Sequence, residues 1–510
     1  MSCVKIDKSD SSRQMRLLAA FSLLSVPFAS GASEWIISPA VSLDVIHTDN
    51  ALLSTDEKKQ DETVTRVKPS ISIYREGGRG KLDFNYSPEY RYYAKDTRSN
   101  ETVHHMRASG DMELVENQLF VDAWGTADQT RLSSSRSSPD GLTGPTENVD
   151  YYSLGVSPYY TVHFGNTSVL EARYSADTVQ YKLDDDQVNQ ADQANQADQD
   201  DQSEADSTAQ TVNLVFGSGT YSVAQVWELS GSHTIEDFSG AKDSNKISRF
   251  RGEFLQQITR RWGLSFAAGY EDFQLIEGED EDGSLWSVGV VFTPTNHTRL
   301  AVGGGKRAFG DDYFVDFKHK SDRMVMTLTY NRDYISARDE VRKPTLFQRQ
   351  DEFGNLVRDA VLDNPPPVTV NGVSTLSAEY YESKRVNASL VYMTQRTRAE
   401  VQAGLINRDY QIAGVNSNAQ DSRDLNTTVA LSRSISGRLR ATSRFFWTDH
   451  ELVNNKEQNY KEWTASLGIG YQLSHDATVS TGFYHLDRKA KLDLNNHKEN
   501  RVNVGYQMRF

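Results

Sequence analysis

Cysteine is almost missing from this chain of 510 residues, which contains only Cys3. Cys3 lies before the apolar run 17–26, so cleavage of an N-terminal leader would remove it as well. It is also misplaced for lipid modification, which would need a cysteine at the cleavage point. The mature chain is therefore expected to have no disulfide, no thiol chemistry and no cysteine-ligated metal.

Long hydrophobic runs are also missing, apart from residues 17–26, and the mean hydropathy is -0.61. That run is too short for a transmembrane helix, which needs about 20 apolar residues. Basic residues precede it and the small residues Ser30, Gly31 and Ala32 follow it. This order predicts a secretory signal peptide over residues 1–32, and 15–32, starting at Met15, would already be a complete signal.

The chain lacks recognisable catalytic and metal-binding motifs. Its 11 histidines show no His-x-x-x-His spacing, and no Gly-x-Ser-x-Gly motif is present. We therefore expect no enzymatic activity, no metal and no cofactor. The net charge of -15 argues against a nucleic-acid partner.

Strict period-two alternation is what the sequence does contain. In residues 82–94 every even position is apolar or aromatic except for one proline, and most odd positions are polar. Such alternation is typical of strands that meet hydrocarbon on one face and water on the other. The same pattern recurs in segments 152–162, 170–174, 250–258, 262–270, 286–292, 324–330, 386–392 and 463–473.

The connections between these segments alternate in length. Short ones cover 75–79, 115–117, 321–323, 436–438 and 474–476, and long polar ones cover 47–62, 128–150, 182–209, 333–378, 409–423 and 488–498. Short periplasmic turns and long extracellular loops are the arrangement of outer-membrane barrels. We therefore predict an all-β fold, a transmembrane antiparallel up-and-down β-barrel over residues 33–510, with about 22 strands (20–22).

The last ten residues support the same fold. Val504, Tyr506, Met508 and Phe510 form one apolar row that ends at the carboxyl terminus. This row resembles the signal by which the barrel-assembly machinery recognises its clients, so that machinery, outer-membrane lipids and lipopolysaccharide are the expected partners. The rival is a soluble sandwich or propeller, which would need a second apolar row to pack sheet against sheet.

The opposite row of the strands carries charges of both signs. These charges either pair across strands and line a hydrated wall, or guide a polar polymer through the lumen. The acidic low-complexity segment 184–206 is expected to be a solvated extracellular loop rather than a cation site. The candidate lumen cations are Lys81, Arg91, Arg173, Arg249, Arg251, Arg307, Arg440 and Arg444, opposed by Asp83, Glu89, Glu171, Glu253 and Glu400.

Residues 286–333 carry a more specific likeness. They include the stretches 286–290, 294–298 and 303–310 and end in Tyr330-Asn331-Arg332-Asp333. Together with Thr48-Asp49-Asn50, this region resembles the outer-membrane β-barrel family associated with PEP-CTERM/exosortase and exopolysaccharide gene clusters. The resemblance implies a role in exporting or anchoring extracellular polysaccharide, with polysaccharide export components as partners, and it implies no catalytic residues.

Three functions remain open at this point. The first is an outer-membrane channel or secretion component for exopolysaccharide or capsule, and the second is a general or substrate-specific diffusion porin. The third is a structural barrel that acts through its surface loops. A TonB-dependent transporter is disfavoured, because the first expected strand begins at Trp35 and leaves no room for a plug domain.

Overall fold

A computed structural model describes residues 35–131, 138, 140–144, 148–182, 206–219, 224–239, 241, 243–276, 280–336, 338, 380–410, 421–453 and 455–510. The predicted signal peptide 1–32 and residues 184–205 of the acidic segment lie outside these ranges. None of the described residues forms a helix long and apolar enough to cross a membrane.

The described chain is built from 22 strands and three short 3-10 turns, η2 (Asp56–Lys58), η3 (Lys456–Gln458) and η4 (Asp493–Asn495). The strands are β1 (Trp35–Thr48), β2 (Glu62–Gly77), β3 (Gly80–Tyr93), β4 (Glu101–Val115), β5 (Leu119–Arg131), β6 (Asn148–Phe164), β7 (Ser168–Lys182), β8 (Ser207–Ser218), β9 (Gln225–Phe238), β10 (Ser244–Gln257), β11 (Trp262–Gln274), β12 (Glu281–Thr295), β13 (Thr298–Arg307), β14 (Gly310–Lys320), β15 (Met324–Ser336), β16 (Tyr380–Met393), β17 (Thr397–Tyr410), β18 (Ser422–Ser434), β19 (Leu439–Leu452), β20 (Tyr460–Gln472), β21 (Ala477–Ala490) and β22 (His497–Arg509).

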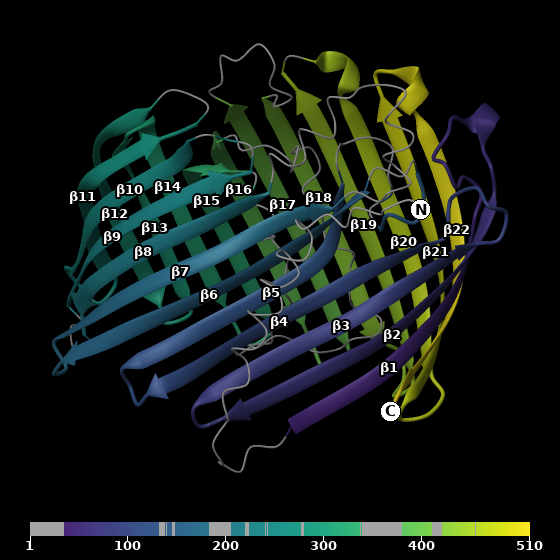
Figure 1. Ribbon diagram of the computed structural model, residues 1–510, viewed down its shortest axis with the longest axis horizontal. Helices are drawn as coiled ribbons and strands as arrows, with labels where there is room; N and C mark the ends of the chain where they lie inside the picture. Colours follow the sequence, from purple (N-terminus) through teal and green to yellow (C-terminus); the bar gives the residue numbers. More distant parts are fainter. Residues whose placement is uncertain are drawn as a thin grey trace, which may run out of the picture.

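The sheet closes on itself, as the wall in Figure 1 shows. Each strand pairs antiparallel with its neighbours in sequence, and β22 pairs with β1 from Ala40↔Arg509 to Thr48↔Arg501. Beyond that ladder, the Phe510 N–H donates to the Pro39 carbonyl at 3.0 Å. The predicted antiparallel barrel of 22 strands is therefore confirmed.

The two ends of the barrel differ as the connection lengths predict. The five short segments named above all lie at one end, together with the carboxyl terminus (Figure 1). The described parts of the six long segments lie at the opposite end. The end with short turns is the periplasmic end, and the end with long loops is the extracellular end.

Apolar side chains point outward along the whole wall. Leu214 on β8, Leu467 on β20 and Val504 on β22 are 50%, 62% and 55% exposed, although they lie in the middle of strands. In water such a band would be an aggregation surface, whereas in a bilayer it meets the lipid tails. The outer rows are those that the alternation predicts, including Tyr506 and Phe510.

Glycines on the inner face make room for large aromatic rings. A Cβ on Gly155 would lie 2.3 Å from the Trp124 ring, and one on Gly303 would lie 2.5 Å from the Phe314 ring. The rings therefore lie almost on the backbone of the neighbouring strands. Gly303 belongs to the glycine-rich stretch 303–305 of β13, which lets Phe314 cover this part of the wall.

The wall departs from regular pairing between β14 and β15. Their ladder stops at Val315↔Tyr330, whereas β15 and β16 stay paired up to Ser336↔Tyr380. The upper part of β15 therefore leaves β14, and the Arg332 Nη2 donates to the Phe309 carbonyl in the β13–β14 turn at 2.7 Å. Residues 333–336, predicted to belong to a loop, are strand.

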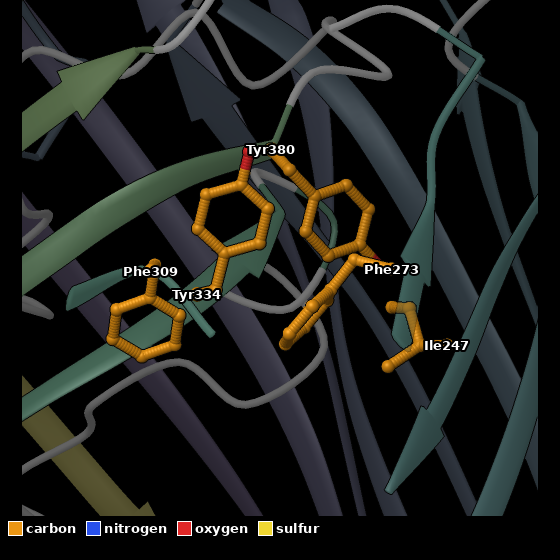
Figure 2. Close-up of a cluster of buried hydrophobic side chains, with 5 residues drawn as sticks. All are labelled: Ile247, Phe273, Phe309, Tyr334 and Tyr380. Atoms are coloured by element: carbon orange, nitrogen blue, oxygen red, sulfur yellow. The ribbon is translucent and has the colours of Figure 1, made fainter. Parts of the chain in front are cut away.

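This inward course of β15 and β16 creates an apolar cluster inside the extracellular half. Tyr334 lies 5.2 Å from Phe273 of β11 and 5.7 Å from Tyr380 between ring centroids. Figure 2 shows the rings of Phe309, Tyr334 and Tyr380 beside Phe273. Tyr334 and Tyr380 share the parity of the outer rows farther along β15 and β16, but both are buried inside the barrel because the upper part of β15 leaves β14.

A pair of arginine substitutions tests the assignment of the two faces. Leu214→Arg on the outer row should cost about 2–4 kcal/mol of folding free energy, because a guanidinium would face hydrocarbon near the bilayer midplane. Thr211→Arg on the inner row of the same strand should cost less than about 1 kcal/mol. The measurement is the unfolding free energy in lipid vesicles, with heat-modifiable gel mobility as a check of folding. Equal costs at the two positions would contradict this assignment.

Candidate functional site: the charged inner wall

The eight candidate lumen cations all lie on the inner row of their strands. On each strand the exposed apolar side chains have residue numbers of one parity, and the candidate cation has the other parity. The cation therefore points to the opposite face of the wall, as the ladder registers show. Their functional role stays a prediction. The structure gathers some of them into two networks near the extracellular end, and it leaves others in separate pairs.

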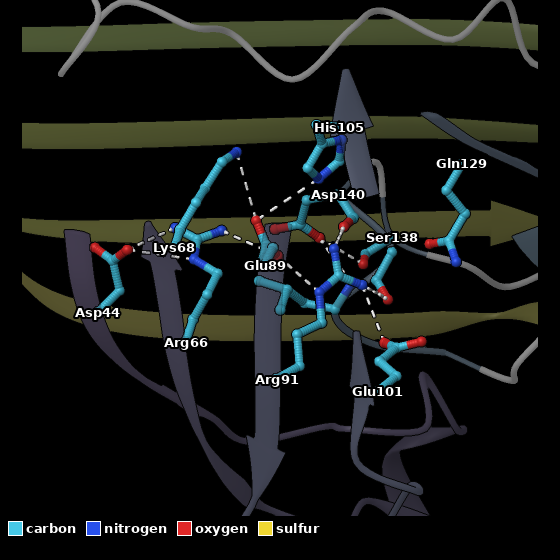
Figure 3. Close-up of polar contacts among 12 residues, drawn as sticks. Asp44, Arg66, Lys68, Glu89, Arg91, Glu101, His105, Gln129, Ser138 and Asp140 are labelled. Carbon is cyan, nitrogen blue, oxygen red and sulfur yellow. Dashed lines mark hydrogen bonds and ion pairs between the residues drawn. The ribbon is translucent and has the colours of Figure 1, made fainter. Parts of the chain in front are cut away.

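The first network is centred on Glu89 of β3, and we call it the Glu89 network. The Glu89 carboxylate lies 2.7 Å from Arg91, 3.9 Å from Arg66 and 3.6 Å from Lys68. His105 of β4 lies 3.8 Å away. Figure 3 shows these side chains pointing toward Glu89 from three neighbouring strands. Glu89 is buried, so several cations are needed to offset the cost of removing its charge from water.

Two further carboxylates extend this network along the wall. Asp44 of β1 accepts from Arg66 at 3.1 Å, and Glu101 of β4 accepts from Arg91 at 3.0 Å. The network therefore ties β1, β2, β3 and β4 together from inside. Such alternating pairs hold the side chains in fixed positions, as a preorganised polar surface requires.

Residues 140–144 of the β5–β6 connection dock on this wall, and we call them the docked segment. Arg91 donates to the carbonyls of Asp140 and Gly141 at 3.1 and 3.2 Å, and Arg98 donates to that of Gly141 at 2.9 Å. The Tyr93 hydroxyl donates to the Leu142 carbonyl at 3.1 Å. The backbone carbonyls of an extracellular connection are thus satisfied by side chains of the barrel interior.

The side chains of the docked segment are held as well. The Asp140 carboxylate accepts from Arg501 of β22 at 2.6 Å, and the Thr143 hydroxyl donates to Glu499 at 3.2 Å. The Leu142 side chain is 2% exposed and belongs to an apolar cluster with Ile46, Val64 and Tyr93. The segment therefore joins β22 to β1, β2 and β3 across the closure of the barrel.

The contact with Arg501 changes the pKa of the Asp140 carboxyl group. Burial alone would raise the pKa, but the Arg501 guanidinium, the Ser138 hydroxyl and the more distant Arg91 and Arg66 outweigh it. The pKa of Asp140 therefore lies well below its ordinary value of 3.8. The carboxylate is ionised throughout the neutral and mildly acidic range.

A second network lies on the opposite part of the wall, around Glu271 of β11. The Glu271 carboxylate accepts from Arg307 of β13 at 2.5 Å and lies 3.7 Å from Arg249 of β10. Asp333 of β15 lies 3.3 Å from Arg307 and 3.5 Å from Arg249. The inward turn of β15 supplies Asp333, so this network depends on the same departure from regular pairing as the apolar cluster.

Arg338, just after β15, reaches the far side of the wall. Its side chain is 2% exposed, pairs with Asp177 of β7 and lies 3.8 Å from Glu236 of β9. It also donates to the Ser207 hydroxyl of β8 at 2.9 Å. The Tyr380 hydroxyl at the start of β16 donates to Glu236 at 2.5 Å. Residues at both ends of the β15–β16 connection thus hold the acidic residues of β7 and β9.

The other candidate cations form smaller contacts. Arg173 lies 2.7 Å from Asp122 and 2.9 Å from Glu171, and Arg251 lies 2.7 Å from Glu253. These two arginines pair with acids two residues away on their own strand, a spacing that the alternation allows because both side chains share one face. Lys81 lies over the Tyr74 ring at 5.8 Å, and Arg440 and Arg444 lie on the inner row of β19.

Sequence reasoning missed several residues of these networks. Arg501 lies in the last ten residues on the row opposite to Val504 and Phe510, and that position could have identified it. Arg66 and Lys68 share the inner row of β2 and were detectable in the same way. Asp140 and Arg338 lie in long connections, where no periodicity shows which part of the wall a side chain will reach.

The wall offers charge but no compact ligand cage for a metal. Among the residues that the structure describes, no group of three or more His, Cys, Asp or Glu side chains is placed to hold a metal ion. The networks pair each carboxylate mainly with guanidinium or ammonium groups. The accessible pairs, such as Arg251 with Glu253, can present fixed charges of both signs to a polar solute.

No protein-family model matches this chain, and no curated protein matches it. Solved structures do. The FrpB iron transporter from Neisseria meningitidis (F3-3 variant) aligns with a TM-score of 0.51 and 10% identity, over 93% of this chain and 82% of that chain. The ferric-catecholate import receptor Fiu from E. coli K12 aligns with a TM-score of 0.50 and 10% identity, over 93% of this chain and 82% of that chain.

At this level of identity the likeness concerns the fold. A closed wall of 22 strands with an apolar outer face matches large outer-membrane barrels. The chain is an outer-membrane β-barrel protein. What the two transporters carry is a property of those proteins, and the inner wall of this barrel has to be interpreted from its own residues.

Asp140→Asn should loosen the docked segment. Losing the charge-assisted bond to Arg501 should weaken docking by about 1–2 kcal/mol, since the Asp140 side chain is partly exposed. Amide hydrogen exchange of residues 141–144 should then accelerate about 5- to 30-fold. The matched control is Asp61→Asn, which removes an exposed pair with Lys95 and should leave this exchange unchanged. Unchanged exchange in the Asp140 variant would show that Arg501 does not hold the segment.

The low pKa of Asp140 predicts how docking depends on pH. A carboxylate whose pKa falls on docking adds stability that is fully present above its ordinary pKa of 3.8. That stability is lost only as the pH falls below this value toward the lowered pKa. Hydrogen exchange of residues 141–144 should therefore stay slow from neutral pH down to about pH 4 after correction for intrinsic rates. Release between about pH 6 and 5 would contradict the assignment of Asp140 as the titrating group.

Proposed function

We propose that this barrel is an outer-membrane channel component that takes part in the export of extracellular polysaccharide. The observation that carries the proposal is the row of charged side chains on the inner face that remain accessible. Among them are Arg251 with Glu253 and Arg299 with Asp316, whose side chains are 41% to 51% exposed. A hydrated chain rich in hydroxyl and carboxyl groups can exchange hydrogen bonds along such a row without entering an apolar region.

Two features support a polymer as cargo. The charged row extends over many strands rather than forming one compact pocket, and a polymer contacts many such positions at once. The link to polysaccharide comes from the sequence resemblance over residues 286–333.

Deletion of the gene should reduce surface polysaccharide by about tenfold or more and cause polysaccharide to accumulate in the periplasm. Accumulation of polysaccharide in the periplasm would distinguish a block in its export from a block in its synthesis. The wild-type chain and the Thr211→Arg variant should restore export, because substitution on the inner row keeps the barrel intact. The Leu214→Arg variant should restore it poorly, in proportion to its loss of assembled barrel.

Unchanged surface polysaccharide in the deletion strain would refute this proposal. If instead the strain lost uptake of a small sugar or organic acid, the porin alternative would replace it. Single-channel recording of the purified barrel would then show conductance blocked by that solute.

A further inference from the structure

The periplasmic end carries a concentration of positive charge that the overall composition hides. Five turns lie between β10 and β19: 258–261, 296–297, 321–323, 394–396 and 435–438. They contain five arginines and one aspartate, a local charge of +4, in a chain with a net charge of -15. The charged residues are Arg260, Arg261, Arg323, Arg396, Arg438 and Asp322.

The other periplasmic turns differ. The turns 78–79, 116–118, 165–167, 219–224 and 473–476 contain Arg79, Glu116 and Asp476, a local charge of -1. The acidic segment 184–206 lies in the sequence between β7 and β8, and the strand ends that it connects are at the opposite end. Positive charge is therefore concentrated on one half of the periplasmic end.

Six basic side chains of this half are exposed and form no ion pair within the described ranges. We define the basic rim as Lys318 of β14 and the five arginines of these turns; all six are exposed. None of the six is in an ion pair with another residue in the described ranges. Other cations of this half are paired: Arg299 lies 2.6 Å from Asp316, and Arg398 lies 3.4 Å from Glu400.

Most cations at the strand ends of this half lie on inner rows, so their side chains face the lumen rather than the lipid. Lys318 and Lys320 lie on the inner row of β14, because Phe317 on the outer row pairs with Leu328. Arg440 and Arg444 continue the positive charge inward along β19. Arg433, which lies on the outer row of β18 with Val429 and Leu431, is the position suited to lipid headgroups.

We propose that the basic rim is the entry site for an anionic polymer, and that the cargo is a carboxylate-bearing polysaccharide. This inference rests on the proposed function and adds the charge of the substrate. Exposed cations around one half of an entrance raise the local concentration of a polyanion, and charged rows at a pore select by sign. Because the screening length is about 8 Å at physiological salt, the attraction acts at the entrance itself and weakens as salt rises.

Binding to the purified full chain in detergent tests the entry site directly. The probes are an oligogalacturonate, which carries carboxylates, and a dextran of equal length, which is neutral. The wild-type barrel should bind the oligogalacturonate at least about tenfold more tightly than the dextran at low salt, and the difference should shrink as salt is added. The triple variant Arg323→Glu, Arg396→Glu and Arg438→Glu should lose most of this preference.

The matched control carries the same change in charge at the other end of the barrel. Lys58→Glu, Lys456→Glu and Lys491→Glu replace three exposed lysines in or beside η2, η3 and η4. This variant should bind the oligogalacturonate as the wild type does. Equal losses in the two triple variants, or a rim variant that is altered only in binding to vesicles containing phosphatidylglycerol, would overturn the inference.

Complementation separates this inference from the proposed function. If deletion abolishes export and the rim variant restores export of acidic polysaccharide fully, the entry site is wrong and the export role stands. If deletion leaves polysaccharide unchanged, the export role is wrong whatever the rim binds. Both the inference and the function are supported if the control variant restores export and the rim variant, assembled to the same level, does not.

Discussion

The satisfaction of backbone hydrogen bonds in hydrocarbon is the constraint on which this structure depends. An unpaired N–H or carbonyl in lipid costs several kcal/mol, so a sheet that crosses a bilayer must have no free edge. The pairing of β22 with β1 meets this requirement, and the bond from the Phe510 N–H to the Pro39 carbonyl continues it past the last strand. Among the described strands, an extended departure lies above Val315↔Tyr330 toward the extracellular end, where β15 turns inward and its backbone pairs with β16.

Closure also explains why polar groups gather inside. With lipid on the outer face, charges in the middle of a membrane-spanning strand are confined to the inner row, and a wall of 22 strands offers many such positions. Charges placed at alternate residues of neighbouring strands come close enough to pair, as Glu89 does with Arg91 and Lys68. These networks therefore follow from the strand period together with the burial of the upper wall, and their pairing alone is no sign of a binding site.

The sequence predicts those features that depend on local periodicity. The faces of β3, β12, β20 and β22, the number of strands and the side of each connection all follow from alternation and loop length. The inward turn of β15 could not be predicted in this way, because it depends on the shortness of the β13–β14 hairpin and on room beside Phe273. The contacts of Asp140 with Arg501 and of Arg338 with Asp177 were equally inaccessible, since they join residues 361 and 161 positions apart through connections without periodicity.

The two ends of the barrel present opposite electrostatic surfaces to a polymer. At the extracellular end, cations such as Arg91 and Arg501 are already occupied by carboxylates and by the docked segment. On the periplasmic rim, Arg323, Arg396 and Arg438 remain unpaired within the described part of the chain and exposed. A polyanion would therefore meet unpaired arginines where it enters, whereas the inner-wall cations Arg91 and Arg501 near the exit are already neutralised. Such a gradient favours capture on the periplasmic side without tight retention at the exit, which is the balance that conduction requires.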